Sequence, residues 1–418
     1  MLRESGPPNP LTAAARGLLA IVLIVVGGPI ADAQAAAEPP AETQAMPPPS
    51  TAASSPTSPT ATRKGWDRFI DPQDGDLDLS YFLENPRGFL PVPLVVTEPA
   101  VGYGGGAAGL FLRPRKEAGE EGWSRPDISG LGGLATQNGT WAAFAGDASR
   151  WLDGRLRTLA GAGVGQANLD FYGLGFERAD FEREVGYSLA FGAVVAQANW
   201  QLAPASPWAA GLRYVYASVT PKLRDEPLFP GLADRVTVRV SAPTAIVEFD
   251  TRDNVFTPTR GVYAEGSLLA SREALGASDN FERFQQVLMG WVPLTRSLTL
   301  GLRGDYAWSS DGTPFFLRPF VAMRGVPALR YQGDQMGSLQ AELRWQFSDR
   351  WSAVAFGGTG KTRTERKAFV ATQDVASGGV GFRYELARKF GLHAGMDVAA
   401  SPGTAAVYFQ VGSAWVRP

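Results

Sequence analysis

The feature of this sequence that most constrains its fold is an alternation of apolar and polar residues, which runs from about residue 100 to the end. In residues 338–347, for example, the odd positions include Leu339 and Trp345, and the even positions include Glu342 and Arg344. About fifteen such runs follow one another, and no segment between them has a helical period. Successive side chains of a β-strand point to opposite faces, so the pattern predicts an all-β chain with one apolar and one polar face.

Two architectures have such faces: a water-soluble sandwich of two sheets and a transmembrane antiparallel β-barrel. A barrel turns its apolar face to lipid and its polar face to the lumen. Arg303, Arg344 and Arg383 all lie on the polar face. Because an arginine facing mid-bilayer lipid costs roughly 2–4 kcal/mol, these residues indicate which face looks inward. The alternation favours the barrel, with the sandwich as the alternative.

The turns predict the number of strands. Asn138-Gly139 is typical of a two-residue hairpin turn. From residue 184 onward, short connections alternate with long polar ones, the last of which is expected at residues 362–375. Both ends of a bacterial barrel usually lie in the periplasm, which requires an even number of strands. We therefore expect 16 strands rather than about fifteen, with two of them in residues 155–183, where the alternation of connection lengths breaks.

The first 35 residues have the pattern of an export signal. Arg3 and Arg16 precede an apolar run at residues 18–26, and small residues follow that provide a cleavage site. A permanent membrane anchor is the alternative, but the run is short for crossing about 30 Å of hydrocarbon. No later stretch reaches 18 apolar residues, so the exported chain is expected to enter the outer membrane of a Gram-negative type bacterium as a barrel.

Between the signal and the barrel at residues 89–418, two segments differ in composition. Residues 36–63 are rich in Pro, Ala, Ser and Thr and predict a disordered linker. Residues 64–88 interleave aromatic and acidic side chains and predict a short amphipathic segment that docks near the periplasmic mouth. A calcium loop is the alternative, but Ile70, Pro72 and Tyr81 would then occupy ligand positions.

The chain closes with one more alternating run. Its apolar face consists of Ala405, Val407, Phe409, Val411 and Trp415. A terminal amphipathic strand that ends in an aromatic residue recurs in outer-membrane barrels, so Phe409 and Trp415 are expected to form a recognition signal for the insertion machinery. An ordinary edge strand is the alternative.

The sequence gives little support for an enzyme, a cofactor site or a nucleic-acid-binding protein. Residues 104–109 fit a dinucleotide-binding glycine pattern, but a strand continues where the helix should begin. His393 is the only histidine, no nucleophile elbow is present, and we interpret His393 as a lumen-facing strand residue. The absence of cysteine excludes disulfides and thiolate metal sites, and a net charge of −2 does not suggest nucleic acid. No catalytic residue, metal or cofactor is predicted.

Two internal motifs resemble the BamA/TamA superfamily of outer-membrane barrels, of the bacterial surface antigen type. Residues 320–326 contain Arg324-Gly325 and are similar to the superfamily's arginine-glycine loop. Residues 248–261 are similar to its strand-turn motif, whose residues here are Asp250, Arg252, Asp253 and Gly261. The resemblance covers about residues 89–418 and implies that the long loop folds into the lumen, with five strands after it.

The resemblance also implies roles for particular residues. In the superfamily the loop arginine packs against inward-facing groups and anchors the loop. Here that residue is Arg324, and Glu342 and Asp397 are inward by their parity, so they are its candidate partners. Where many members have an aspartate on the next strand, this chain has residues 355–358 (AFGG), which makes Glu342 or Asp397 the expected partner.

Three functions are compatible with this barrel. The first is insertion or translocation of proteins or other macromolecules, in which a periplasmic partner protein supplies the POTRA domains that about 55 residues before the barrel are too short to form. The second is a passive or plugged pore or structural barrel. The third is an outer-membrane hydrolase. The expected contacts are outer-membrane lipid and the machinery that inserts the barrel itself.

Overall fold

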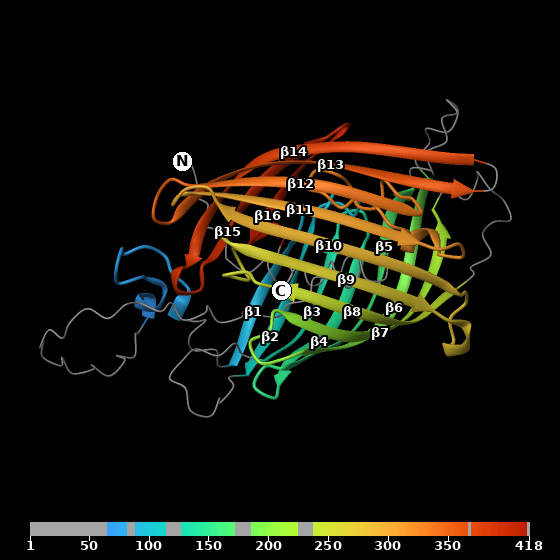
Figure 1. The fold of residues 1–418 in the computed structure, drawn as a ribbon, viewed down its shortest axis with the longest axis horizontal. Coiled ribbons are helices and arrows are strands. Elements are labelled where there is room, and N and C mark those ends of the chain that lie inside the picture. The colour runs from blue at the N-terminus through green and yellow to red at the C-terminus, as the bar shows by residue number, and fades with distance from the viewer. Residues whose placement is uncertain are drawn as a thin grey trace, which may run out of the picture.

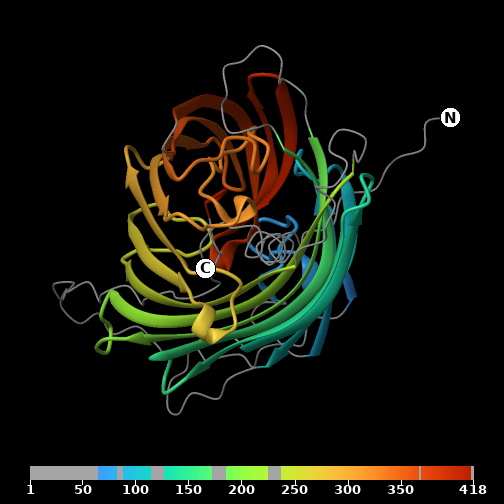
Figure 2. The same ribbon diagram turned by 90° about the vertical axis from the view of Figure 1, so that its right-hand side faces the viewer.

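The computed structural model describes residues 65–81, 88–113, 127–171, 185–224, 237–366 and 369–415. Sixteen strands form one sheet in chain order, with every neighbouring pair antiparallel, and the sheet curls into a barrel (Figures 1 and 2). The predicted all-β antiparallel barrel of 16 strands is thus confirmed. The strands are β1 (Gly88–Val96), β2 (Gly104–Arg113), β3 (Asp127–Thr136), β4 (Trp141–Trp151), β5 (Leu156–Phe171), β6 (Val185–Gln201), β7 (Trp208–Leu223), β8 (Val238–Asp250), β9 (Gly261–Ser271), β10 (Phe281–Pro293), β11 (Leu298–Ser309), β12 (Gln335–Gln346), β13 (Trp351–Arg366), β14 (Phe369–Ala387), β15 (Leu392–Ser401) and β16 (Thr404–Val411).

The helical elements of the described residues are short. They are the 3-10 helices η1 (Gly65–Phe69), η3 (Glu273–Leu275), η4 (Phe315–Leu317) and η5 (Arg388–Phe390). In the part of the chain that the structure describes, no helix has the length and apolar character needed to cross a membrane.

The barrel has two ends and one seam. We call the end at which β1 begins and β16 ends the terminal rim, and the other end the opposite rim. β1 and β16 are the two edges of the sheet, and no pairing joins them within the described residues. The strands beside this seam are short, with 9 residues in β1 and 8 in β16, whereas β5, β6 and β14 have 16, 17 and 19.

Exposure of alternate residues shows which face is outside. In β12, Leu339 is 66% exposed and Trp345 54%, whereas Ser338 and Glu342 are buried. Arg383 is buried at 2%, as its place on the inner face predicts. Exposed tryptophans gather on the strand ends at the terminal rim: Trp151, Trp200, Trp208, Trp345 and Trp351. The outer face is therefore apolar along the strands, with an aromatic band at that rim.

Two details of the predicted strand map are wrong. Residues 156–171 form the single strand β5 instead of beginning two strands, and residues 172–184 lie outside the described part. The connection lengths break their alternation because β1–β2 and β3–β4 have short connections at the opposite rim, where the hairpins between β5 and β12 have longer ones.

The long polar connection expected at residues 362–375 is the second error. β13 and β14 stay paired out to Arg366 and Phe369. Lys361 lies directly opposite Asp374 in this pairing, so opposite charges face each other across the two strands. A hairpin can therefore continue with polar residues where apolar alternation has ended.

Parts of the predicted domain map fall outside the described residues. The signal at residues 1–35 and the linker at residues 36–63 are both outside them, and these predictions stay untested. Of the segment predicted at residues 64–88, residues 65–81 are described, and Figure 1 shows them in blue at the terminal rim.

Candidate functional site

The connection between β11 and β12, residues 310–334, folds back within the ring of strands (Figure 2). An antiparallel bridge joins Phe320 to Gln332, and the Val321 N–H donates to the Tyr331 carbonyl over 3.0 Å. The apolar side chains of this interior loop are buried in two clusters. Val321, Met323 and Val326 pack with residues of β11, β12 and β14. The other cluster joins the loop to inward-facing residues of β1 to β8 and to Phe281 of β10. Its members in the loop are Phe316, Leu317, Phe320 and Leu329.

Two contacts tie the interior loop to the wall that contains β1 to β6. The rings of Phe315 and Tyr187 meet edge to face, with centroids 5.3 Å apart. The Ala328 N–H donates to Glu98 Oε1, in the β1–β2 connection, over 3.1 Å. Burial raises the pKa of Glu98 to about 7, against the opposing effect of hydrogen bonds from the Ala328 and Ala100 amides.

Arg324 lies at the tip of the interior loop and faces the other wall. Its Nη2 is 2.7 Å from Glu342 Oε2 on β12, and its Nη1 is 2.7 Å from Asp397 Oδ2 on β15. The structure thus brings together the loop arginine and both of its candidate partners. These contacts are the geometry that anchoring would require, although the anchoring role itself stays a prediction.

A second arginine and an aromatic ring complete this cluster. Arg383 on β14 binds Asp397 through both Nη atoms, at 2.5 and 3.0 Å. Phe356 on β13 places its ring centroid 3.4 Å from the Arg324 Cζ, a cation–π arrangement. We name Arg324, Glu342, Arg383 and Asp397 the interior lock. Its two positive and two negative charges balance, as buried charges require.

Sequence reasoning missed Phe356 and the role of Arg383. Phe356 belongs to the AFGG stretch at residues 355–358, where the resemblance implies an aspartate that this chain lacks. Its parity on the strand placed it inside, and an aromatic face is a known partner for a guanidinium group. Arg383 lies opposite Gly395, one inward position from Asp397, so the diagonal contact follows from the register rather than from the sequence.

Gly325 shows how closely the loop approaches the strands. Its φ is +87°, and a Cβ at this position would lie 3.0 Å from the Ala400 backbone nitrogen on β15. The Gly325 N–H donates to the Tyr408 hydroxyl over 2.9 Å, and the Ser401 hydroxyl donates to the Gly325 carbonyl over 2.7 Å. A side chain here would strain the backbone and separate the loop from β15.

The strand-turn motif builds the β8–β9 connection at the terminal rim. Arg252 binds both carboxylate oxygens of Asp250, at 2.9 and 2.7 Å. Asp253 accepts hydrogen bonds from the backbone amides of Thr259 and Arg260. Gly261 has φ +107°, and a Cβ there would lie 2.3 Å from the Thr251 carbonyl oxygen. These residues therefore hold a tight turn, and none of them contacts the interior lock.

The end of the chain departs from its predicted path. Phe409 lies in β16, but this strand ends at Val411, and the prediction that Trp415 continues its apolar face is wrong. The backbone turns at Gly412, and the Ser413 N–H donates to the Phe256 carbonyl in the β8–β9 connection. Trp415 is 3% exposed and packs against Trp291 of β10, with ring centroids 6.3 Å apart. Its ring is therefore buried beside β10 instead of extending the face of β16.

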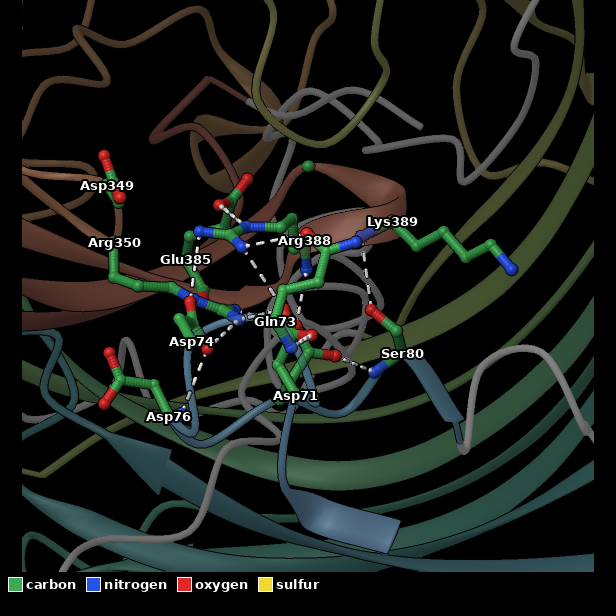
Figure 3. A network of polar contacts seen from close by, with 12 residues as sticks. Asp71, Gln73, Asp74, Asp76, Ser80, Asp349, Arg350, Glu385, Arg388 and Lys389 are labelled. Carbon is green, nitrogen blue, oxygen red and sulfur yellow. Dashed lines mark hydrogen bonds and ion pairs between the residues drawn. The ribbon is translucent and has the colours of Figure 1, made fainter. Parts of the chain in front are cut away.

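A second ionic cluster lies at the terminal rim (Figure 3). Asp71, Asp74 and Asp78 all bind Arg350, the last residue of the β12–β13 connection, at 2.5 to 2.7 Å. Arg388 of η5 approaches Asp71 and Asp74 at 3.4 and 3.1 Å. We name these five residues the rim clasp.

Local turns present the three carboxylates. The Gly75 N–H donates to the Asp71 carbonyl over 2.8 Å, which reverses the chain between Asp71 and Asp76. The Leu79 N–H donates to the Leu386 carbonyl at the end of β14, also over 2.8 Å. The backbone and the side chains of residues 71–79 thus fasten the segment to the same hairpin end.

The rim clasp favours ionised carboxylates. The hydrogen bond from Arg350 lowers the pKa of Asp74 to about 2. Burial opposes ionisation of Asp78, but hydrogen bonds from Ser80 and Arg350 outweigh it and lower this pKa as well. The carboxylates are occupied by arginines, and within the described residues no group of three or more His, Cys, Asp or Glu side chains is arranged to hold a metal.

Comparisons with known proteins bear on the fold. No family model matches the chain, and no curated protein matches its sequence. Solved structures do: BamA from Haemophilus ducreyi lacking POTRA domains 1–3 superposes with a TM-score of 0.52 at 12% identity, over 77% of this chain and 69% of that one. CdiB from Escherichia coli gives a TM-score of 0.55 at 11% identity, over 77% of this chain and 62% of that one.

CdiB from Acinetobacter baumannii is a further structural match, with a TM-score of 0.53 at 8% identity over 77% of this chain. The chain spans 62% and 59% of the two CdiB chains, which is less than two thirds of their length. Identities this low establish the fold alone. The barrel of BamA type that the two internal motifs predict is confirmed at that level.

Proposed function

We propose that this chain is an outer-membrane barrel that takes part in the insertion or translocation of proteins or other macromolecules. The terminal rim then faces the periplasm, and the apolar outer face contacts lipid. The proposal draws on the fold shared with BamA and CdiB structures and on the open seam between β1 and β16.

The open seam is the observation that carries the proposal. A passive barrel gains stability by pairing its first and last strands, because unpaired backbone groups in lipid are costly. Here no pairing joins β1 to β16 within the described residues, and these two edge strands are the shortest in the sheet. A transmembrane strand needs about 9–11 residues, so the 8 residues of β16 favour a locally thinner bilayer at the seam. An unpaired edge beside a strand that is short for the bilayer is a suitable place for other protein chains to pass.

Two prolines in β1 favour translocation of other chains over insertion, in which an incoming strand would pair with β1. A proline within a strand must point its missing donor away from the hydrogen-bonded neighbour. Pro91 and Pro93 both lie in β1, opposite Gly109 and Ala107 of β2. The backbone nitrogens of these prolines, which lack an N–H, should therefore face the open edge. An incoming strand would find two fewer N–H donors along a strand of 9 residues. Between the two activities, translocation therefore fits the edge of β1 better than insertion does.

A separate protein is the proposed source of the substrate-receiving arm. Superfamily members that insert or secrete proteins carry POTRA domains of about 75 residues each, whereas the described segment before β1 spans residues 65–81 and binds the rim. In this proposal the partner protein receives the substrate and the open seam lets it pass.

A quantitative proteome of the outer membrane and the secreted fraction tests it. On deletion of the gene, particular barrels or secreted proteins should fall severalfold while their transcripts stay constant. A proteome that changes only by the loss of this chain would contradict the proposal.

A plugged pore is the second candidate, favoured by the apolar packing of the interior loop. Phe316 is 1% exposed and Phe320 4%, so the loop fills part of the lumen with side chains rather than water. In planar bilayers a plugged barrel should show small, fluctuating currents. Large, steady single-channel currents would contradict the plug.

A hydrolase is the third and weakest candidate. His393 is 8% exposed, and its Nδ1 lies 3.0 Å from the Gly391 carbonyl oxygen. This arrangement suits a structural histidine. Hydrolysis of phospholipid by the refolded protein, lost on His393→Ala, would revive the hydrolase proposal.

A further inference from the structure

The segment that carries the rim clasp has two chemically different faces. Ile70 and Leu77 form an antiparallel bridge, so their side chains lie on the same side. The next residues, Asp71 and Asp78, point the other way, toward Arg350. The acidic pair is 8% and 6% exposed, whereas Ile70 and Leu77 are 39% and 42% exposed.

Trp66 extends the apolar face. It lies in η1, one turn before Ile70, is 80% exposed, and touches Phe69 with ring centroids 5.5 Å apart. The rim clasp thus holds the segment in an orientation in which Trp66 is largely exposed and Ile70 and Leu77 are partly exposed. We call these three residues the apolar face of the segment.

The apolar face continues the aromatic band of the barrel exterior. The Tyr384 hydroxyl donates to the Leu77 carbonyl over 2.8 Å. The Tyr384 ring packs against Trp351 at 5.0 Å, and Trp351 packs against Phe382 at 5.9 Å. Trp351 and Phe382 are 41% and 44% exposed, while Ser352 next to Trp351 is buried, so these rings lie on the lipid-facing side.

We infer that the apolar face of residues 65–81 enters the interfacial layer of the periplasmic leaflet and anchors the segment to zwitterionic lipid. Tryptophan and tyrosine rings at barrel ends lie at headgroup level, and Leu77 is hydrogen-bonded to one of them. Exposed Asp67 and Asp76 lie beside Trp66 and Leu77, which disfavours a strongly anionic surface. The segment would then fix the bilayer to the rim near β13 and β14, an effect beyond the proposed function.

The chain contains no cysteine, so single labels can be placed without altering other sites. Full-length Trp66→Cys and Leu77→Cys, with Asp76→Cys as the matched control, would carry a small fluorophore in phosphatidylcholine vesicles. A nitroxide on the upper acyl chain should quench the labels at 66 and 77 at least about twofold more than the label at 76. Aqueous iodide should show the reverse order. Equal quenching at all three positions would overturn the inference.

Two further measurements keep the test decisive. Ile70→Cys replaces any variant that does not fold, as judged by its heat-modifiable migration on gels. In whole cells, a photoreactive amino acid in place of Trp66 should give lipid adducts. A discrete protein adduct would instead identify a protein partner and overturn the lipid anchor.

Discussion

The interior lock and the rim clasp fasten irregular segments to the same barrel in different ways. In the interior lock the carboxylates of Glu342 and Asp397 belong to strands, and the interior loop contributes Arg324. In the rim clasp the carboxylates belong to the segment, and the barrel contributes Arg350 and Arg388. The lock carries two charges of each sign, whereas the clasp sets three carboxylates against two arginines.

This difference determines what happens when each cluster is broken. A carboxylate on a strand cannot leave the interior, so losing its partner leaves a buried charge that costs several kcal/mol. A carboxylate on a short segment can return to water by detaching. The lock is therefore expected to affect the barrel and its loop together, and the clasp to affect the segment alone.

The largest effect is expected for Arg324→Ala. It leaves Glu342 buried without this ion pair, which should cost about 3–5 kcal/mol and release the interior loop while the barrel still forms. Limited proteolysis should find new cleavage within residues 310–334, and the denaturant midpoint should fall. Arg330→Ala in the same loop, which loses a hydrogen bond to Thr404, should cost only about 1 kcal/mol. An unchanged cleavage pattern in Arg324→Ala would show that the interior lock does not hold the loop.

The next largest effect is expected for Arg350→Ala, which removes the common partner of Asp71, Asp74 and Asp78. Residues 65–81 should detach and become sensitive to protease, while the denaturant midpoint of the barrel stays unchanged. Arg388→Ala removes the longer contacts of the rim clasp, from a side chain that is 30% exposed, and should release the segment less than Arg350→Ala does. A lowered midpoint in Arg350→Ala would remove the distinction between the two clusters.

Acid should release the rim clasp before it unfolds the barrel. The folded-state pKa of Asp74 is lowered to about 2 by the hydrogen bond from Arg350. A lowered carboxylate pKa stabilises docking above the unfolded value of about 3.9, and this stabilisation is lost as the pH falls toward 2. A fluorophore on Asp76→Cys should report a docked segment at pH 5 and a released one near pH 2. Release at pH 5 to 6 would contradict the contacts to Arg350.

The smallest effect is expected at Glu98, which holds the interior loop through the Ala328 N–H. Burial raises its pKa to about 7, so the folded state binds more protons than the unfolded state between about pH 4.5 and 7. Docking of the loop should weaken as the pH rises through this window. Glu98→Gln keeps an acceptor for the amide and should abolish the dependence. An identical pH profile for the natural chain and for Glu98→Gln would show that another group causes the pH dependence of loop docking.

The sequence predicted the parts of this structure that follow from local rules. Period-two alternation predicted the barrel and its inner face, and the parity of Glu342 and Asp397 placed them within reach of a loop arginine. Arg350 gave no such signal, because it lies more than 270 positions after the aspartates that it binds. Trp415 was misplaced because Gly412 turns the chain, and alternation alone does not reveal where a strand ends.

One comparison of proteomes tests most directly whether the interior lock serves the proposed function. A strain with the gene deleted would be complemented with the natural chain, Arg324→Ala or Arg330→Ala, each confirmed at equal level in the outer membrane. We expect Arg324→Ala to restore the barrel itself but not the barrels or secreted proteins lost on deletion, whereas Arg330→Ala should restore both. Full restoration by Arg324→Ala would contradict this expectation.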